Sequence, residues 1–301
     1  MELHGIFAPL TATLAPDGSL APERLRGNIA RYNQTHLAGY VMNGSTGESV
    51  LLRWEEIYRI WETAKAAAAP GKILIAGSAA EATAETIEHT NRAASLGYDF
   101  ALVRTPHYFK PQMTVDAEAE YYLRVADAAR IPILVYSVPV FTHYTVEAPL
   151  IARVASHPNI VGMKDSSGDV AGVKKIIAAA PREFRTLVGS ASTLFESLEI
   201  GAVGAILALA CAFPELCCEI YELSRAGNRE GAYALAQKLT APAKILGPQY
   251  GIAGLKYTLD RLGYYGGAPR PPLLPVNQTA KAQIDAMLET VLMQAPGGGR
   301  N

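Results

Sequence analysis

The chain has 301 residues, of which 50% are hydrophobic and 18% are charged, so it can bury a large core and is not expected to be disordered. Its 27 Lys and Arg residues nearly balance its 28 Asp and Glu residues, and the formal net charge is -1. Such a charge leaves no broad positive surface for nucleic acid or for an anionic membrane. We therefore expect the partner to be a small molecule, with no nucleic acid and no membrane.

The three cysteines, Cys211, Cys217 and Cys218, lie close together in one apolar segment. Because none has the Cys or His spacing of a zinc site, we expect buried free thiols and a reducing compartment. The chain begins with a strand-like run at 5–11 and shows neither a signal peptide nor a membrane span. These features predict a cytoplasmic protein.

Short apolar runs rich in β-formers alternate with segments of helical periodicity along most of the chain. The expected strands are 5–10, 38–42, 72–77, 100–105, 132–138, 159–164, 185–189 and 204–209. The expected helices between them are 21–32, 54–69, 83–96, 115–129, 146–156, 170–180 and 192–200. Strands spaced by roughly 20 to 35 residues are typical of parallel βα units, and their simplest closure is a (β/α)8 TIM barrel of α/β class.

After the eighth expected strand the pattern becomes helical, with breaks near Gly227, at Gly247-Pro248 and at 263–269. We predict a barrel with the active site at 1–212 and a C-terminal helical extension at 213–293. The tail 294–301 is rich in glycine and is expected to be disordered.

The most informative residue is Lys164, a cation at the end of the sixth expected strand. Strand alternation predicts that it shares a face with Gly162 and Ile160, and the missing side chain of Gly162 is expected to leave room for the lysine stem inside the barrel. Burial disfavours an ammonium ion, and a neutral amine is the nucleophile that forms a Schiff base with a ketone. Taken alone, this residue could instead extend its ammonium to water.

Polar residues also follow the second and fifth expected strands. The run 43–48 places the hydroxyls of Ser45 and Thr46 between Gly44 and Gly47, and backbone N–H groups there can turn toward a carboxylate where the next helix begins. The alternative is a tight turn with a helix cap. Tyr136 brings a phenol near the barrel mouth, where it either transfers protons beside the lysine or simply bonds a backbone carbonyl.

Further strand ends add an aromatic loop and two glycines. The proline-bracketed loop 105–111 contains Tyr108 and could reach into a site or across an interface. Gly189 and Gly204 can let a ligand approach the backbone closely. The six histidines show no paired spacing of metal ligands, so no metal is expected.

Taken in order, these motifs resemble the pyruvate-dependent class I aldolases and lyases of the dihydrodipicolinate synthase and N-acetylneuraminate lyase superfamily. The GxxGE loop, the Tyr-x-x-Pro strand end and the Gly-x-Lys strand occur in family order, and the resemblance extends from residue 5 to about residue 267. It implies that Lys164 forms the Schiff base and that Tyr136 transfers protons. It further implies that Ser45 and Thr46 relay protons and hold the carboxylate of the ketoacid, pyruvate, without a cofactor.

The same resemblance implies roles for residues farther from the lysine. Tyr108 matches a tyrosine that inserts across a dimer interface into the neighbouring site, so a homo-oligomer is expected, a homotetramer built as a dimer of dimers. Ile206 matches a residue that contacts the pyruvate unit through its backbone. Gly44 and Gly189 are expected to contact the substrate as well.

Two departures bear on the substrate. Dihydrodipicolinate synthases carry an arginine two residues after the strand-end proline, where this chain has Phe141, and an apolar ring cannot replace a bidentate cation. The runs 135–139, 157–166, 168–170 and 263–267 resemble instead the 4-hydroxy-2-oxoglutarate aldolase branch. There the serine two positions after the lysine contacts the distal carboxylate of the substrate, which implies that role for Ser166. Phe141 and His143 depart from this branch too.

We therefore expect a Schiff-base lyase that cleaves or forms a carbon–carbon bond in a 2-keto-4-hydroxy acid, with pyruvate as product or substrate. The alternatives are a dihydrodipicolinate synthase, a neuraminate-lyase-like aldolase, and a barrel that binds 2-ketoacids as a sensor without turnover. The presence together of Lys164, Tyr136, Ser45 and Tyr108 favours an enzyme, because carboxylate binding alone needs neither the lysine nor the tyrosines.

Overall fold

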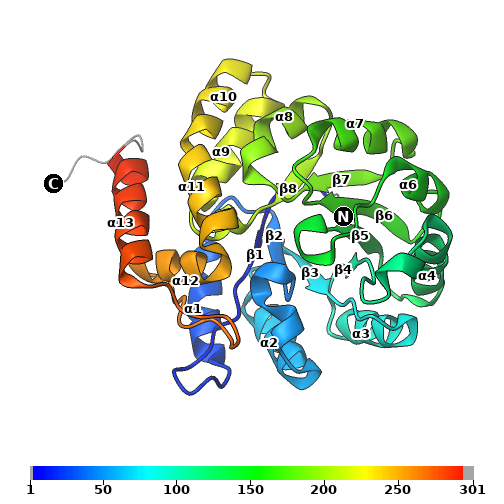
Figure 1. Cartoon of the computed structure of the whole chain (residues 1–301), viewed down its shortest axis with the longest axis horizontal. Coiled ribbons are helices and arrows are strands. Elements are labelled where there is room, and N and C mark those ends of the chain that lie inside the picture. The colour runs from blue at the N-terminus through cyan, green and yellow to red at the C-terminus, as the bar shows by residue number, and fades with distance from the viewer. Residues whose placement is uncertain (1–2, 294–301) are drawn as a thin grey trace.

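Eight parallel strands close into a barrel in the computed structural model, which describes residues 3–293 (Figure 1). The strands are β1 (Gly5–Pro9), β2 (Gly39–Met42), β3 (Ile73–Gly77), β4 (Phe100–Arg104), β5 (Ile133–Ser137), β6 (Ile160–Asp165), β7 (Arg185–Val188) and β8 (Gly204–Ile206). Each strand pairs with the next along the chain, and β8 pairs with β1. The predicted (β/α)8 barrel is confirmed, and every expected strand overlaps an observed one.

Helices between the strands cover the outside of the barrel (Figure 1). They are α1 (Pro22–Tyr32), α2 (Trp54–Ala67), α3 (Thr83–Ser95), α4 (Val115–Ala128), α6 (Ala148–Val154), α7 (Val170–Ala179) and α8 (Leu194–Glu199). The sequence did not predict the short helix α5 (Pro139–Thr142), which follows β5 directly. It begins at Pro139, whose fixed φ suits the first position of a helix.

The inside of the barrel is filled by side chains that alternate with the helix-facing ones along each strand. This interior cluster includes Phe7, Val41, Ile75, Leu102, Leu134, Tyr136, Leu187 and Ile206. Branched and aromatic side chains thus form a packed core below the mouth, as is usual in such barrels. Polar chemistry is therefore restricted to the carboxyl ends of the strands.

The alternation of side-chain faces predicted for the sixth strand is wrong where that strand begins. The pairing of β5 with β6 is irregular, since Ile133 pairs with Ile160 while Leu134 pairs with Gly162. As a result, Ile160 packs in the helix-facing cluster and does not share the face of Lys164. A Cβ atom on Gly162 would lie 2.2 Å from the carbonyl oxygen of Arg185, so the absence of a side chain here lets β6 approach β7. The space for the side chain of Lys164 therefore comes from a residue other than Gly162.

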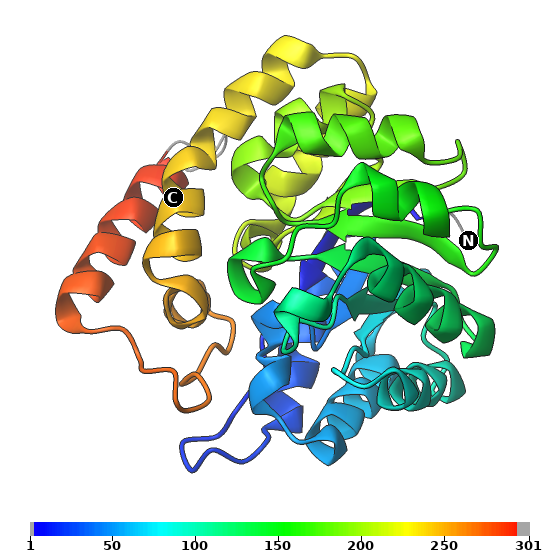
Figure 2. The ribbon, with the colours of Figure 1, turned by 45° about the vertical axis from the view of Figure 1, so that its right-hand side comes forward.

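The chain continues after β8 as helices on one side of the barrel, coloured yellow to red in Figure 2. They are α9 (Pro214–Arg225), α10 (Arg229–Lys238), α11 (Thr240–Lys244), α12 (Gly251–Arg261) and α13 (Gln278–Met293). The break expected at Gly247-Pro248 is instead a π-helical turn (Ile245–Gln249) between α11 and α12. Of these and the other described helices, none is both long and apolar enough to cross a membrane. The expected disordered tail 294–301 lies outside the described residues.

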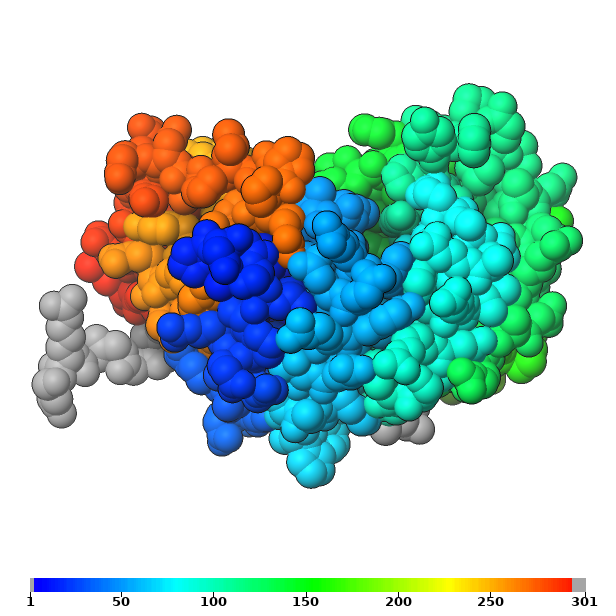
Figure 3. Space-filling model, turned by 90° about the horizontal axis from the view of Figure 1, so that it is seen from below, coloured from blue at the N-terminus to red at the C-terminus, as the bar shows by residue number. Residues whose placement is uncertain are grey.

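Segment 262–277 contains no helix and turns back to the barrel, so the break there is longer than expected. Figure 3 shows this segment, in orange, against the blue N-terminal part of the chain. The hydroxyl of Tyr265 donates to the carbonyl of Leu14 at 2.6 Å, and the backbone N–H of Arg270 donates to Glu48 at 2.6 Å. The first bond ties this segment to the chain after β1, and the second ties it to the loop that follows β2.

Candidate active site

Lys164 and Tyr136 face each other on neighbouring strands, because they are in register in the β5–β6 pair. Nζ of Lys164 lies 3.4 Å from the hydroxyl of Tyr136 and 4.5 Å from the centre of its ring. Each residue is only 5% exposed. The amine is therefore held inside the barrel next to a group that can give or take a proton.

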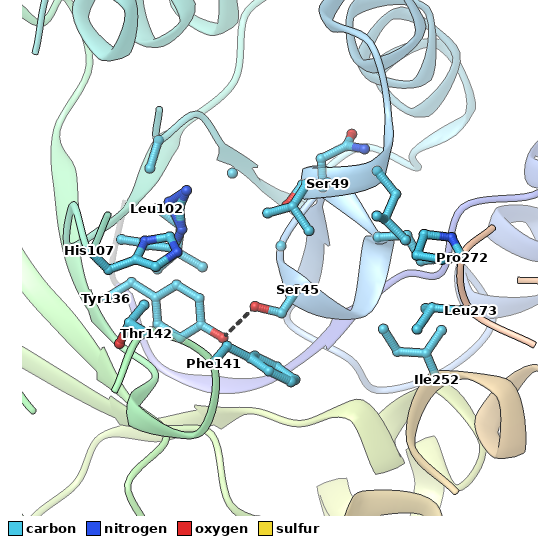
Figure 4. Close-up of a pocket in the computed structure, with 18 residues that line it drawn as sticks. Ser45, Ser49, Leu102, His107, Tyr136, Phe141, Thr142, Ile252, Pro272 and Leu273 are labelled. Atoms are coloured by element: carbon cyan, nitrogen blue, oxygen red, sulfur yellow. Dashed lines mark hydrogen bonds between the residues drawn. The ribbon is translucent and has the colours of Figure 1, made fainter. Parts of the chain in front are cut away.

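Ser45 extends this pair into a chain of three polar groups. Its Oγ lies 3.3 Å from the hydroxyl of Tyr136, the contact drawn as a dashed line in Figure 4. Ser45 opens a 3-10 turn (Ser45–Gly47), and a second turn (Ser49–Leu51) follows before α2 begins at Trp54. The helix start expected at residue 54 is therefore confirmed, and the loop before it brings the hydroxyl of Ser45 to the tyrosine.

The glycine that makes room for the lysine is Gly189, at the end of β7. A Cβ atom there would lie 2.9 Å from Cε of Lys164 and 1.9 Å from Oγ of Ser166. Real Cβ atoms essentially never come so close, so a side chain at position 189 would force the side chains of Lys164 and Ser166 to shift. Ser166 is thereby placed beside the end of the lysine stem.

A cavity of about 370 Å³ opens at the barrel mouth (Figure 4). Its lining residues are Asn43, Gly44, Ser45, Glu48, Ser49, Val50, Leu51, Gly77, Ala79, Leu102, Arg104, His107, Tyr136, Phe141, Thr142, Ile252, Pro272 and Leu273. That volume suits a small organic ligand. The lining thus includes three of the nine expected site residues, Gly44, Ser45 and Tyr136. It does not include the other six, which are Lys164, Tyr108, Thr46, Ser166, Gly189 and Ile206.

One wall of the cavity comes from a part of the chain that the sequence analysis did not assign to the site. Ile252 and Leu273 belong to the C-terminal part of the chain and lie across the cavity from Tyr136 (Figure 4). Phe141, on α5, also lines the cavity and is 58% exposed, whereas His143 ends α5 in the left-handed conformation. The side chain at position 141 is thus placed to touch a ligand, but it offers only an apolar ring.

Tyr108 lies outside this cavity. Its side chain is 78% exposed and packs edge-on against Phe109, with ring centres 5.2 Å apart. Within its own chain it therefore takes no part in the site.

A cluster of charged residues near the end of β4 was also not predicted from the sequence. Oε2 of Glu81 accepts hydrogen bonds from the backbone N–H groups of His107, at 2.8 Å, and Tyr108, at 3.0 Å. Its Oε1 accepts one from Nη2 of Arg104 at 3.2 Å. Burial raises the pKa of Glu81, but these bonds and the Arg104 charge outweigh it, and the pKa falls below its usual value. The available signal was a basic residue at a strand end, the same feature that singled out Lys164.

A second missed group ties the Ser45 loop to the C-terminal helices. Glu48 and Lys256 form an ion pair 2.6 Å long with both side chains fully buried. Burial lowers the pKa of Lys256, and the carboxylate of Glu48 opposes that shift. The residues around Lys256 in the sequence did not indicate a buried ion pair, because its partner lies more than two hundred residues away.

The cysteines and histidines form no metal centre in the described part of the chain, where no group of three or more His, Cys, Asp or Glu side chains could hold an ion. Cys211, Cys217 and Cys218 are buried free thiols, as the sequence predicted. Burial raises the pKa of the Cys211 thiol far above its usual value, which makes it a structural group.

Residues 2–291 match the family described as the dihydrodipicolinate synthetase family. The chain is 33% identical over 285 residues to a 4-hydroxy-tetrahydrodipicolinate synthase of Acidiphilium cryptum, covering 95% of this chain and 97% of the relative. It is 31% identical over 296 residues to a probable mitochondrial 4-hydroxy-2-oxoglutarate aldolase of Emericella nidulans, covering 96% of each chain.

A solved dihydrodipicolinate synthase has the same fold as this chain. The chloride-inhibited dihydrodipicolinate synthase of Acinetobacter baumannii, solved in complex with pyruvate, superimposes with a TM-score of 0.92 at 28% identity. The match covers 96% of this chain and 99% of that structure. The chain therefore belongs to the dihydrodipicolinate synthetase family and is a class I, pyruvate-dependent lyase.

Proposed function

We propose that this enzyme cleaves or forms a carbon–carbon bond in a 2-keto-4-hydroxy acid such as 4-hydroxy-2-oxoglutarate. The observation that carries the proposal is the chain of contacts from Nζ of Lys164 to the hydroxyl of Tyr136 and on to Oγ of Ser45. It provides a nucleophile with a proton path beside it, which is what Schiff-base chemistry requires.

In the cleavage direction, Nζ of Lys164 attacks the keto carbon, and water leaves as the iminium forms. Tyr136 takes the proton of the 4-hydroxyl group while the bond between C3 and C4 breaks, and its electron pair moves into the iminium to give an enamine. The aldehyde leaves. Protonation of the enamine at C3 and hydrolysis of the imine then release pyruvate and the free amine, with Ser45 relaying protons to and from Tyr136.

The loop after β2 is proposed to hold the ketoacid carboxylate, through Ser45, Thr46 and the backbone at Gly44. Gly189 and Ile206 are proposed to bound the pyruvate unit from β7 and β8, where the first lies against the lysine stem and the second is fully buried. Ser166, beside Cε of Lys164, is proposed to contact the far part of the substrate.

A second candidate is dihydrodipicolinate synthase activity, which the 33% identity to the Acidiphilium cryptum enzyme favours. We prefer the aldolase because the residue at the cavity wall where an arginine is expected in such synthases is Phe141. A ring offers no hydrogen bonds to a carboxylate.

We also propose a homo-oligomer, a dimer of dimers, in which Tyr108 reaches the site of a neighbouring subunit. The exposure of both Tyr108 and Phe109 supports this, because adjoining aromatic rings are seldom left to solvent without a partner. A cytoplasmic location is proposed from the three free thiols.

The test is to incubate the protein with pyruvate and borohydride, which reduces an iminium to a stable amine. One reduced adduct per chain is expected, at Lys164, and Lys164→Ala should abolish it. Lys174→Ala, which removes an exposed lysine on α7, is the matched control and should label like the parent. An adduct that persists in Lys164→Ala would overturn the assignment.

Turnover is measured separately, by pyruvate release from 4-hydroxy-2-oxoglutarate and by condensation of pyruvate with aspartate semialdehyde. Cleavage of the first substrate supports the aldolase. Labelling at Lys164 without turnover of either compound would instead indicate a barrel that binds 2-ketoacids as a sensor.

A further inference from the structure

Arg104 belongs to the same row of side chains as the catalytic pair. It ends β4 in register with Tyr136 on β5, which is in turn in register with Lys164 on β6. Residues in register on parallel strands point to the same face of the sheet, so Arg104 points inward at the barrel mouth, as Tyr136 does. It accordingly lines the cavity, together with His107 from the following loop.

The guanidinium of Arg104 lacks a partner for one of its donors. Nη2 binds Glu81, but Nη1 is buried and has no hydrogen-bond partner. A buried donor on a charged group is costly to leave unpaired, more so than a neutral one. Nη1 is therefore available to donate to a ligand.

Glu81 is poorly placed to supply that acceptor, because its carboxylate is already held by the loop. Oε2 is fixed by the backbone N–H groups of His107 and Tyr108. Oε1 is shared between Arg104 and Nδ1 of His107, which lies 2.8 Å away but at an angle that makes no hydrogen bond. One carboxylate thus faces both basic side chains, and the pairing of Arg104 is incomplete.

Apart from His107, the rest of the lining offers an anion no basic side chain. Several of the lining residues are apolar, among them Leu102, Phe141 and Leu273 (Figure 4). Glu48, the acidic residue of the lining, is itself paired with Lys256. Among the residues that line the cavity, Arg104 is the one Lys or Arg side chain.

We infer that Arg104 binds the terminal carboxylate of a dicarboxylic 2-ketoacid whose keto carbon is attached to Lys164. The substrates of this enzyme are then acidic at both ends. This inference rests on the proposed function and deepens it, because it supplies the far carboxylate with a charged partner, where Ser166 offers only a neutral hydroxyl. Nη1 can donate to that carboxylate while Nη2 stays bound to Glu81, and a hydrogen bond between two charged groups is stronger than one between neutral groups.

The experiment measures imine formation, so that it does not depend on turnover. Adduct trapped by borohydride is followed against the concentration of 2-oxoglutarate, and in parallel against 2-oxopentanoate, which has the same chain length but a methyl group in place of the far carboxylate. The variants are Arg104→Met, which keeps an unbranched stem without charge, and Arg104→Lys, which keeps the charge. Arg124→Met, at an exposed position on α4, is the control.

In the parent, 2-oxoglutarate should half-saturate labelling at a lower concentration than 2-oxopentanoate. Arg104→Met should raise the half-saturating concentration of 2-oxoglutarate at least tenfold and change that of 2-oxopentanoate less than twofold. Arg104→Lys should fall between parent and Arg104→Met, and Arg124→Met should match the parent.

Equal losses for both ketoacids in Arg104→Met would show that Arg104 only supports the loop, and would overturn the inference. So would an unchanged preference for 2-oxoglutarate. If instead pyruvate itself gives no adduct in the parent, it is the proposed Schiff-base function that fails, and the two outcomes are thereby told apart.

Discussion

The carboxylate of Glu48 and the ammonium of Lys256 lie 2.6 Å apart with both side chains fully buried, and they join the loop after β2 to helix α12. Both groups have further partners, since Glu48 accepts from the backbone N–H of Arg270 and Lys256 donates to the carbonyl of Ala268. Ser45 lies three residues before Glu48. The C-terminal helices therefore help to position a hydroxyl of the candidate proton path.

Removing one partner of this pair should be strongly destabilising. Lys256→Met leaves the buried carboxylate of Glu48 without its counter-charge, which typically costs about 3–5 kcal/mol. The double variant Glu48→Gln with Lys256→Met should recover part of that loss, because no buried charge remains. Denaturant unfolding of the parent and the variants measures both effects.

The matched control is Arg26→Met, which removes one partner of an exposed ion pair with Glu23 and should change stability by less than about 1 kcal/mol. If Lys256→Met were as mild as this control, the pair would not hold the loop. Turnover measured on folded Lys256→Met should also fall, since Ser45 loses its support.

Tyr136→Phe removes one hydroxyl with little change in volume, so the fold should survive. Turnover should fall by about 100-fold or more, the usual share of a positioned acid or base. Tyr257→Phe, which removes a hydroxyl bonded to Asp285 on the outer helices, is the control and should leave turnover unchanged. Full activity in Tyr136→Phe would mean that another group, such as Ser45 through a water, moves the proton.

Two glycine substitutions should distinguish a residue that shapes the candidate site from one that the sheet needs for stability. In Gly189→Ala the new Cβ meets the side chains of Ser166 and Lys164, so imine formation should weaken at least tenfold while the protein stays folded. In Gly162→Ala it meets the backbone carbonyl of Arg185, which cannot move without disturbing the β6–β7 pairing. That variant should therefore lose thermal stability first, and thermal melts together with borohydride labelling distinguish the two effects.

Glu118, on α4, should make stability depend on pH. It is fully buried, neither carboxyl oxygen has a hydrogen-bond partner, and burial, with a smaller contribution from Glu81, raises its pKa from 4.5 to about 8. Between those values the folded protein keeps a proton that the unfolded chain has lost, so the free energy of unfolding falls as pH rises. Below about 4.5 both states are protonated and this penalty is absent.

Glu118→Gln cannot ionise and should lose that dependence. The difference in unfolding free energy between Glu118→Gln and the parent should move in favour of the variant by about 1.4 kcal/mol per pH unit across this window. Unfolding curves at pH 5, 6, 7 and 8 measure it. Parallel stability profiles for the two proteins would show that Glu118 is ionised in the fold.

The barrel could be predicted from sequence because each strand is a short apolar run and each helix has its own periodicity, both of which are local properties. Lys164 and Tyr136 were found because each ends such a run. The irregular pairing near Ile160 could not be predicted, because it depends on how β5 and β6 fit together and not on either strand alone.

Contacts between distant segments account for the other omissions. Ile252, on α12, and Leu273, in segment 262–277, reach the cavity through the packing of the C-terminal part of the chain against the barrel. Lys256 is recognisable only once Glu48 is beside it. Arg104 ends a strand as Lys164 does, but its significance comes from its register with Tyr136 and from an unpaired nitrogen atom. These contacts depend on how distant segments pack together, and a single sequence does not show that packing.

Substrate choice separates the two candidate activities. With Phe141 at the cavity wall, the protein should cleave 4-hydroxy-2-oxoglutarate and should condense pyruvate with aspartate semialdehyde poorly. Ser166→Ala should weaken cleavage by about tenfold, because a hydrogen bond to a charged group contributes about 1.5–3 kcal/mol and this one is expected at the far carboxylate. Ser192→Ala, which removes a hydroxyl bonded to Ser190, is the control and should leave cleavage unchanged.

Steady-state kinetics of the parent and both serine variants on the two substrates decide the matter. Efficient condensation with aspartate semialdehyde would show that a cation replaces the missing arginine, and Arg104, which lines the cavity with a free donor, is the first candidate to remove, ahead of Lys110 and His143. That result would reassign the substrate branch. It would leave the Schiff base at Lys164 intact, because both activities begin with the same attack on pyruvate or on a ketoacid that contains it.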